Sequence, residues 1–404
     1  MRGQTRGEAV SRPSPSIVRR KRFSGVKNAA CEDCRYRAGD RPPSVKQGAC
    51  DTIRAMETTL PFTLVDRLAD THRLKRDDYE RIIAGFTPAL AAHASARAQA
   101  ETRRHYGTDI FTRGLIEFTS VCKNDCYYCG LRCSNRTAER YRLTPDQILQ
   151  CADAGHFFGY RTFVLQGGED PFYTDEVLCD VVTRIKAAHP DCAVTLSVGE
   201  RSRESYERLF AAGADRYLLR HETAAPGHYA SLHPAQMSYA NRMRCLSDLK
   251  DIGYAVGVGF MVGTPGQTAR ELACDLKFVE EFGPEMCGIG PFVAHHATPF
   301  AHEPNGSVEL TCFLLSLLRL IKPDLLIPAT TALGTLDPQG REKGVRAGAN
   351  VVMPNLSPVD VRKKYELYDN KICTGEEAAE CRWCLDARME GIGYRIVVDR
   401  GDPR

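Results

Sequence analysis

The sequence predicts an α/β fold, a (β/α)8 barrel with a helical cap before it and an extension after it. Three observations support this prediction. Short apolar or β-branched runs alternate with helical patterns through most of the chain, which is typical of a parallel sheet. Eight such runs are present, and eight parallel strands can close into a barrel. The length of 404 residues and the 43% hydrophobic content allow one large barrel with a sizeable core.

The first 55 residues differ in composition from the rest of the chain. They are rich in Arg, Ser and Pro at first and then carry Cys31, Cys34 and Cys50 among Gly and Pro. We expect this extension, 1–55, to be poorly ordered. It is either an organellar transit peptide or an upstream extension before a start at Met56. The second interpretation is favoured because no amphipathic helix is evident, and a metal knuckle on the three cysteines is a further alternative.

We expect the sequence after residue 55 to form three structural parts. Residues 56–108 form a helical cap, because Val65, Leu68 and the residues after them follow helical spacing. The barrel is expected over 109–357 and a C-terminal extension over 358–404. The predicted strands are 115–119, 162–166, 193–198, 216–220, 255–262, 286–293, 325–330 and 349–353. The predicted helices are 144–158, 174–188, 202–213, 240–252, 268–281 and 308–321, the first opened by Thr144-Pro145-Asp146.

A cysteine loop directly follows the first predicted strand. Its three cysteines, Cys122, Cys126 and Cys129, have the spacing C-x3-C-x2-C. Three thiolates can hold an iron–sulfur cluster, which ordinarily takes four cysteines. One iron then keeps an open coordination position, and an open position distinguishes catalytic metal sites from closed structural ones. A zinc knuckle or a set of buried thiols is the alternative interpretation.

The carboxyl ends of the other predicted strands are polar, and in a barrel these ends form the active site. The second strand ends in Gln166-Gly167-Gly168, where glycines let a ligand approach the backbone. Arg216, Arg220 and Glu222 surround the fourth strand. Burying two arginines and one carboxylate without partners would be costly. They therefore predict a site for anions, and a salt-bridged barrel interior is the alternative.

Three other groups of residues after the strands are candidates. Thr330 and Thr331 present two adjacent hydroxyls that can bind a carboxylate. His295 and His296 are expected to be ordinary loop residues, because no acidic or thiol side chain lies at a useful spacing from them. The C-terminal extension holds Cys373, Cys381 and Cys384, which predict a second iron–sulfur cluster, a zinc site or an unoccupied site.

Charge and cysteine usage limit the class of protein. The net charge is +3, and the basic excess lies in residues 1–27, so the body is nearly neutral and has no electrostatic footprint for nucleic acid. No apolar run approaches the about 20 residues that a membrane-spanning helix needs. Seventeen cysteines without a secretory signal indicate a reducing compartment. We expect a cytoplasmic protein, or an organellar stromal one if the extension is a transit peptide.

The strand ends together resemble the HydE family of FeFe-hydrogenase maturation enzymes, which belongs to the radical SAM superfamily with biotin synthase and methylornithine synthase. The resemblance covers about residues 60–390, whereas the cysteine loop alone resembles only the superfamily. It implies a barrel of the radical SAM type. The motifs that carry it are Ile116–Thr119, Leu165–Pro171, Arg216–Glu222, Gly288–Phe292, Pro328–Ala332 and Asn350–Asn355.

The resemblance implies a [4Fe–4S] cluster and S-adenosylmethionine (SAM), which the enzyme cleaves reductively to a 5′-deoxyadenosyl radical. Cys122, Cys126 and Cys129 would hold the cluster, and Cys373, Cys381 and Cys384 match an optional second cluster. The implied SAM contacts are Tyr128, Gln166, Gly167, Gly168, Thr195, Glu222 and Arg242. The implied lining of the substrate cavity is Arg113, Arg216, Arg220, Thr330, Thr331, Met353, Tyr365 and Tyr368.

The resemblance also implies a place in H-cluster assembly. The substrate would be a small anionic iron–cysteine complex from HydG. HydF would be the acceptor scaffold, and a ferredoxin or flavodoxin would be the electron donor. Methylornithine synthase and biotin synthase are the alternative enzymes, and an iron–sulfur carrier is the non-enzymatic alternative. Biotin synthase is disfavoured because the second and third predicted strands, 162–166 and 193–198, contain no cysteine.

Overall fold

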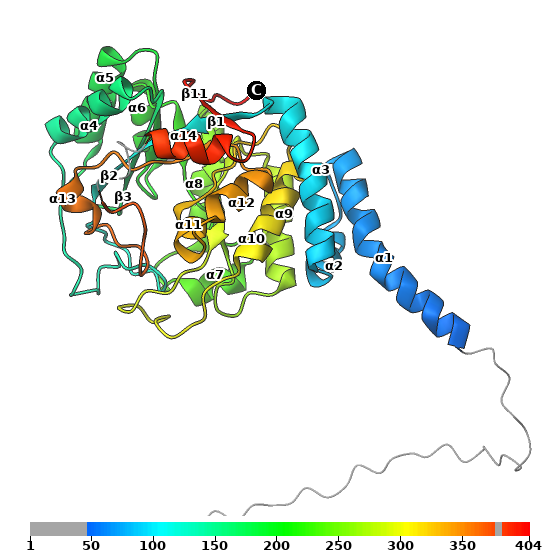
Figure 1. Cartoon of the computed structure of the whole chain (residues 1–404). Helices are drawn as coiled ribbons and strands as arrows, with labels where there is room; N and C mark the ends of the chain where they lie inside the picture. Colours follow the sequence, from blue (N-terminus) through cyan, green and yellow to red (C-terminus); the bar gives the residue numbers. More distant parts are fainter. Residues whose placement is uncertain (1–46, 376–381) are drawn as a thin grey trace, which may run out of the picture. The chain divides into compact units, whose positions relative to one another are not determined.

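The computed structural model describes residues 47–375 and 382–404 (Figure 1). The chain divides into two units, 1–52 and 53–404, and the described part of the first is the start of helix α1 (Gln47–Thr71). Among the described residues, no helix is long and apolar enough to cross a membrane.

The predicted helical cap is present, but it begins at Gln47, inside the segment that was expected to be poorly ordered. Cys31 and Cys34 of that segment lie outside the described residues. The cap continues with α2 (Arg76–Ala84) and α3 (Pro88–Tyr106). On the outside of the barrel, α2 packs against α9 (Ala269–Phe282) and α3 against α10 (Val308–Ile321). The buried face of α2 carries Tyr79, whose hydroxyl donates to Glu280 Oε2 at 2.7 Å.

Six parallel strands form the continuous part of the barrel, in the order β2-β3-β4-β5-β6-β8. Each coincides with a predicted run, because β-branched and apolar residues suit a wall that is covered on its outer face. Two short strands, β7 (Met261–Val262) and β9 (Gly290–Pro291), pair with each other. The six are β2 (Gly114–Thr119), β3 (Thr162–Gly167), β4 (Ala193–Ser197), β5 (Arg216–Leu218), β6 (Ala255–Val258) and β8 (Met286–Cys287).

The segment 325–330 and strand β10 (Val351–Val352) close the ring between β8 and β2. Parallel bridges join Met286 to Leu326, Pro328 to Val351, and Leu115 to Asn355. The Cys287 amide donates to Leu326 O at 3.1 Å, and the Leu356 amide donates to Leu115 O at 2.7 Å. Eight strand positions therefore form one closed circle, and the predicted (β/α)8 barrel is confirmed.

Six long helices follow the strands where the sequence predicts them. Each begins after a Ser or Thr whose hydroxyl accepts a first-turn backbone N–H, a cap worth about 1 kcal/mol. They are α4 (Pro145–Phe157), α5 (Asp175–Ala188), α6 (Arg203–Ala211), α8 (Tyr239–Ile252), α9 (Ala269–Phe282) and α10 (Val308–Ile321). Shorter helices are α7 (Pro226–Leu232), α11 (Thr331–Leu336), α12 (Gly340–Arg346), α13 (Val359–Arg362) and α14 (Arg382–Glu390).

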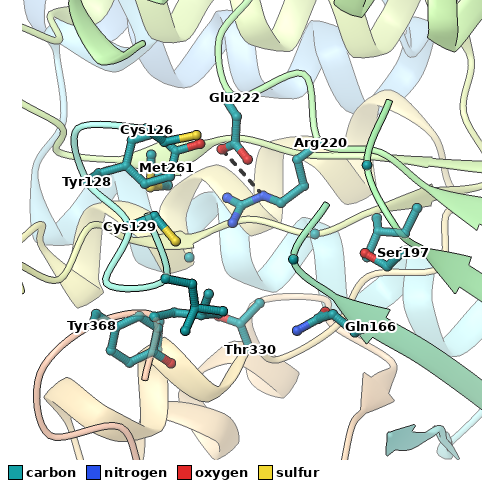
Figure 2. Close-up of a pocket in the computed structure, with 18 of the residues that line it drawn as sticks. Cys126, Tyr128, Cys129, Gln166, Ser197, Arg220, Glu222, Met261, Thr330 and Tyr368 are labelled. Carbon is teal, nitrogen blue, oxygen red and sulfur yellow. Dashed lines mark ion pairs between the residues drawn. The ribbon is translucent and has the colours of Figure 1, made fainter. Parts of the chain in front are cut away.

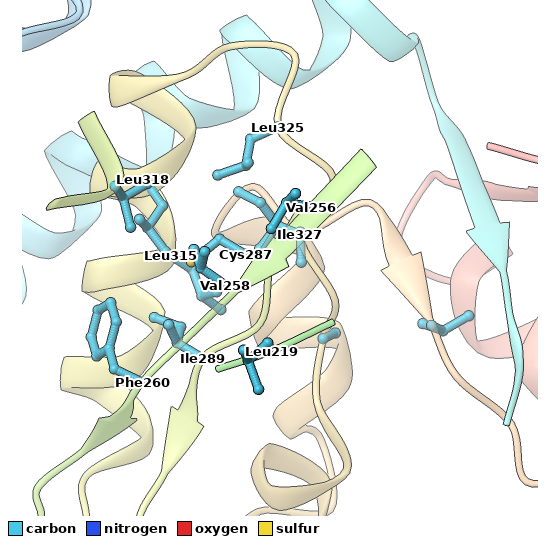
Figure 3. Close-up of a cluster of buried hydrophobic side chains, with 14 of the residues drawn as sticks. Leu219, Val256, Val258, Phe260, Cys287, Ile289, Leu315, Leu318, Leu325 and Ile327 are labelled. Carbon is cyan, nitrogen blue, oxygen red and sulfur yellow. The ribbon is translucent and has the colours of Figure 1, made fainter. Parts of the chain in front are cut away.

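The main apolar core lies between the strands and the surrounding helices. Alternate residues of β6 and β8, such as Val258 and Cys287, point outward toward Leu315 and Leu318 of α10 (Figure 3). The inward positions between them include Gly288 and Gly290, which line a cavity. The core therefore holds the wall rigid from outside while the barrel interior stays open at its mouth.

The C-terminal tail closes the amino end of the barrel. Strand β11 (Arg395–Val397) pairs with β1 (Asp109–Thr112), which also pairs with β10. Beyond β11, Arg400 O accepts hydrogen bonds from Thr162 Oγ1 at 2.7 Å and from Arg216 Nη2 at 2.9 Å. The cavity consequently opens toward the carboxyl ends of the strands.

Candidate active site

A cavity of about 360 Å³ lies at the carboxyl ends of the barrel strands (Figure 2). This volume is within the range of small-molecule sites. The cysteine loop lies on one side, the turn after β5 on another, and residues 365–371 of the C-terminal extension complete the wall. The cysteine loop and the polar strand ends that the sequence predicted therefore line a single cavity.

The three cysteines of the loop converge on this cavity. Cys122, Cys126 and Cys129 all line it, and none forms a disulfide. Burial and, to a smaller extent, the neighbouring Cys122 raise the pKa of the Cys129 thiol to about 12. Burial also raises the pKa of Cys126 well above its usual value, as do Cys129 and Cys122. Three adjacent half-buried thiols can ionise together only beside a strong positive charge, so the donor set fits a metal cluster.

Hydrogen bonds that do not involve the thiols fix the shape of the loop. Arg132 forms two bonds of 2.7 Å to the Asp125 carboxylate, and this pairing holds the pKa of Asp125 well below its usual range. Arg140 donates to the carbonyl oxygens of Ser120, Leu131 and Arg132. A polar scaffold therefore presents the sulfurs in advance of any metal.

Gly130, directly after the last cysteine, sits where no side chain fits. A Cβ there would lie 2.2 Å from Glu366 O and 2.4 Å from His295 Cδ2. Its amide donates to Leu367 O at 2.9 Å. The loop is thus in direct backbone contact with the C-terminal extension.

The turn after β5 brings two opposite charges to the cavity. Arg220 and Glu222 both line it, and Arg220 Nε lies 3.7 Å from Glu222 Oε2 (Figure 2). Buried Arg220 Nε and Nη2 and Glu222 Oε2 have no hydrogen-bond partner among the described residues. Glu222 has a positive φ of 63°, which costs a non-glycine residue roughly 1–2 kcal/mol. Unpaired polar atoms in a cavity indicate that a ligand completes their bonding.

Arg242 supports this turn from α8. Its Nε donates to Glu200 Oε1 at 2.6 Å, and its Nη1 donates to Arg220 O at 2.5 Å. Gly168 lies on the opposite side, where a Cβ would be 2.2 Å from Val121 O and 2.7 Å from Cys122 Cβ. Only a glycine lets β3 pass this close to the cysteine loop.

A buried ion pair in the far wall was not predicted. Lys371 Nζ donates to Glu117 Oε1 at 2.6 Å, to Glu117 Oε2 at 2.8 Å and to Tyr365 O at 2.9 Å. Asn355 Nδ2 donates to Glu117 Oε2 at 2.8 Å. Both charged residues line the cavity. Thr330, Thr331 and Met353 lie in the same wall, and the buried hydroxyl Oγ1 of Thr330 has no partner in the part of the chain described here.

Most of the predicted site residues lie around this one cavity. Nothing in the sequence indicated Met237 or Lys371, and Glu117 was indicated only as part of the motif Ile116–Thr119. The predicted residues that line it are Cys122, Cys126, Tyr128, Cys129, Gln166, Gly167, Gly168, Arg220, Glu222, Arg242, Thr330, Thr331, Met353, Tyr365 and Tyr368.

Three predicted residues do not reach the cavity, and their assignment is corrected. Thr195 lies one layer deeper on β4, and Ser197 takes its place in the lining. Arg216 begins β5 at the amino end of the barrel, where its Nη2 lies 2.6 Å from Asp402 Oδ1. Arg113 is buried with its Nη1 2.7 Å from Met286 Sδ. The alternative interpretation, a salt-bridged barrel interior, describes Arg216.

The described tail cysteines and the paired histidines do not line the cavity. Cys373 Sγ accepts a hydrogen bond from Arg341 Nη2 at 2.9 Å, Cys384 is exposed, and Cys381 lies outside the described residues. The second cluster therefore stays a prediction. His296 Nδ1 lies 2.7 Å from Asp369 Oδ1, so an acidic partner comes from a distant part of the chain, which the local spacing did not indicate.

Comparisons with known proteins agree with the cysteine loop and the fold. The Radical SAM superfamily profile matches residues 116–279. The chain is 47% identical over 318 residues to the [FeFe] hydrogenase maturase subunit HydE of Thermotoga maritima, covering 78% of this chain and 89% of that protein. It is 27% identical over 330 residues to the 3-methylornithine synthase of Methanosarcina acetivorans, covering 78% and 92%. The crystal structure of methylornithine synthase (PylB) superposes with a TM-score of 0.72 at 23% identity, covering 83% of this chain and 97% of that one.

Proposed function

The chain belongs to the HydE family of radical SAM enzymes, and we propose that it acts in the assembly of the FeFe-hydrogenase H-cluster. Its cofactors are those of the superfamily, a [4Fe–4S] cluster and SAM. When bound, they supply the electron and the sulfonium that yield methionine and a 5′-deoxyadenosyl radical. The observation that carries the proposal is that three half-buried cysteines face the same cavity as Arg220 and Glu222, which have buried polar atoms without hydrogen-bond partners among the described residues.

Cys122, Cys126 and Cys129 hold the cluster in this proposal. They are the only cysteines in the lining of the cavity among the described residues. Three cysteines would leave one iron of the cluster without a protein ligand, and the amino and carboxylate groups of SAM would bind that iron. Biotin synthase uses cysteines on the inner strands for its second cluster, and the absence of such cysteines from the described lining speaks against that reaction.

The cofactor lies between the cysteine loop and the turn after β5. Glu222 and Arg220 offer unpaired atoms to its hydroxyls and charged groups, and Gln166, Gly167 and Gly168 form the opposite edge. Tyr128 closes the space beside the cysteines, and its hydroxyl donates to His233 Nε2 at 3.2 Å, since His233 Nδ1 donates to Tyr229 O. Burial lowers the pKa of His233 to about 4, so this neighbour is neutral and adds no charge to the cofactor site.

The substrate occupies the remaining space toward the far wall. Thr330 and Thr331 provide hydroxyls, Arg220 provides a positive charge, and Met353, Tyr365 and Tyr368 form the sides. A guanidinium with adjacent hydroxyls suits a small anion that carries a carboxylate. These features support an anionic iron–cysteine complex as substrate, supplied by HydG and passed on to HydF. A ferredoxin or flavodoxin would supply the electron.

The first test is SAM cleavage. Anaerobically reconstituted protein reduced with dithionite should release methionine and 5′-deoxyadenosine, which chromatography quantifies. Cys126→Ser should abolish this release, whereas Cys133→Ser should not, because Cys133 is exposed and does not line the cavity. Full activity of Cys126→Ser would refute the assignment of the cluster ligands.

The second test is maturation. Apo-hydrogenase is incubated with HydG, HydF and this protein, and hydrogen evolution is measured. Activation that depends on this protein supports the proposal. If SAM is cleaved but no hydrogenase is activated, and lysine is converted to methylornithine instead, the alternative reaction replaces it.

A further inference from the structure

The turn after β5 is held in an unusual conformation. Arg220 and Glu222 point into the cavity, while His221 between them is fully buried on the outer side. Glu222 has a left-handed backbone. A non-glycine residue keeps such a conformation only where surrounding contacts fix it. Besides Arg242, which lines the cavity and donates to Arg220 O, a second set of contacts comes from behind the strand, outside the cavity.

His221 forms a buried pair with Asp275 of α9. Both side chains are 0% exposed, and His221 Nε2 lies 3.4 Å from Asp275 Oδ1. The Gly259 amide donates to His221 Nδ1 at 3.3 Å. Because Nδ1 accepts this hydrogen bond, the proton of the neutral ring is on Nε2 and faces Asp275. The tautomer and the position of the carboxylate therefore agree.

The same carboxylate oxygen also fixes the far side of the turn. The Ala224 amide donates to Asp275 Oδ1 at 2.5 Å, and the Thr223 amide donates to His221 O at 2.8 Å. The Glu222 amide donates to Gly259 O at 3.0 Å. Glu222 thus lies between two neighbours that contact Asp275, His221 before it through the ion pair at 3.4 Å and Ala224 after it through its amide hydrogen bond.

The surroundings of the His221–Asp275 pair are apolar. The rings of Phe278 and Phe260 lie 4.6 Å and 5.6 Å from that of His221, centroid to centroid. Apolar residues would fill such a layer at lower cost than a buried histidine and carboxylate. Unlike apolar side chains, His221 and Asp275 accept hydrogen bonds from the backbone amides of Gly259 and Ala224, and these bonds orient the turn.

We propose that His221 and Asp275 are positioning residues that hold Glu222 in the orientation that binds SAM. The inference rests on the proposed contact between Glu222 and SAM. Asp275 acts through the turn, since it does not line the cavity. Its removal therefore weakens SAM binding and leaves assembly of the cluster intact.

The experiment measures SAM affinity by titrating the reduced holoprotein and following the electron paramagnetic resonance signal of its cluster. Asp275→Ala should raise the Kd for SAM about tenfold or more, equivalent to about 1.4 kcal/mol, with unchanged iron content. Asp275→Asn keeps an acceptor for the Ala224 amide and should recover part of the affinity. The control is Val279→Ala, one turn further along α9 and 0% exposed, which should lower thermal stability with unchanged SAM affinity.

A double-mutant cycle with Glu222→Gln separates the possible failures. If Asp275 acts through Glu222, the double variant binds SAM no more weakly than Glu222→Gln alone. Additive losses, or equal losses of affinity in Asp275→Ala and Val279→Ala, would overturn the positioning role. If Glu222→Gln binds SAM normally, the proposed cofactor contact fails and the inference fails with it. If Glu222→Gln weakens binding and Asp275→Ala does not, only the inference fails.

Discussion

The buried Lys371–Glu117 pair offers the sharpest test of how the cavity wall is held. We predict that Lys371→Met destabilises the protein by ~3–5 kcal/mol, the usual cost of leaving one buried charge without its partner. The structure supports this magnitude, because Lys371 donates three hydrogen bonds and the side chain of Glu117 is only 1% exposed. At about 2 °C per kcal/mol, the lower end of the usual scale, the melting temperature should fall by about 6–10 °C.

The stability lost in Lys371→Met should increase with pH. Burial raises the pKa of Glu117, and Lys371 opposes that rise. Without Lys371, the pKa of Glu117 in the folded protein rises further. A group whose pKa is raised by folding favours the folded state at low pH, and that contribution is lost as the pH rises through the raised pKa. The deficit of Lys371→Met should therefore be larger at pH 8 than at pH 5.5.

The control is Lys364→Met on the same C-terminal extension. Lys364 pairs with Glu139 at 2.7 Å, but the Glu139 side chain is 68% exposed, so loss of this pair should leave the melting temperature nearly unchanged. The double variant Glu117→Gln/Lys371→Met should recover much of the stability. Differential scanning fluorimetry at both pH values measures all four proteins. Equal deficits in the two lysine variants, or no pH dependence, would refute a buried charge pair.

Three further predictions concern the cavity. Thr331→Val should weaken substrate binding while leaving uncoupled SAM cleavage nearly intact, and parallel loss of both in product assays would argue against separate substrate and cofactor regions. Gly130→Ala should lower the iron content after reconstitution, because its Cβ would lie 2.2 Å from Glu366 O; a normal iron content would contradict the close contact. Asp402→Ala should lower the melting temperature by a few degrees, since it leaves Arg216 without its carboxylate at 2.6 Å; an unchanged melting temperature would show that the tail does not seal the barrel.

The sequence predicted the mouth of the barrel well because the signals there are local. A strand followed within a few residues by cysteines, by Gln166-Gly167-Gly168 or by Thr330-Thr331 places those residues at one edge once the sheet is parallel. The wrong assignments concern how far along the barrel axis a residue lies from the cavity. Arg216 and Arg220 share a face of the fourth strand, but four residues at ~3.3 Å each separate them by about 13 Å along it. Which of the two reaches the cavity depends on where β5 begins, and propensity does not fix that boundary.

The residues that the sequence could not indicate are those paired across long distances. Glu117 and Lys371 are 254 positions apart, and His221 and Asp275 lie on different elements of the barrel. A single Glu in an apolar strand, or a single Asp in an amphipathic helix, gives no sign of a buried partner and would ordinarily be placed in contact with solvent. Only the fold shows that each has its partner.

The C-terminal extension is part of the site and not an appendage to a finished barrel. Its residues 365–371 complete the cavity lining, and Leu367 O accepts the amide hydrogen of Gly130 beside the last cysteine. Lys371, two residues before Cys373, is bonded to Glu117 on the first barrel strand. Any change at the tail cysteines that moves this short stretch must therefore strain both the substrate wall and the cysteine loop. A barrel that ended at residue 357 would keep its strands but lose one side of its cavity.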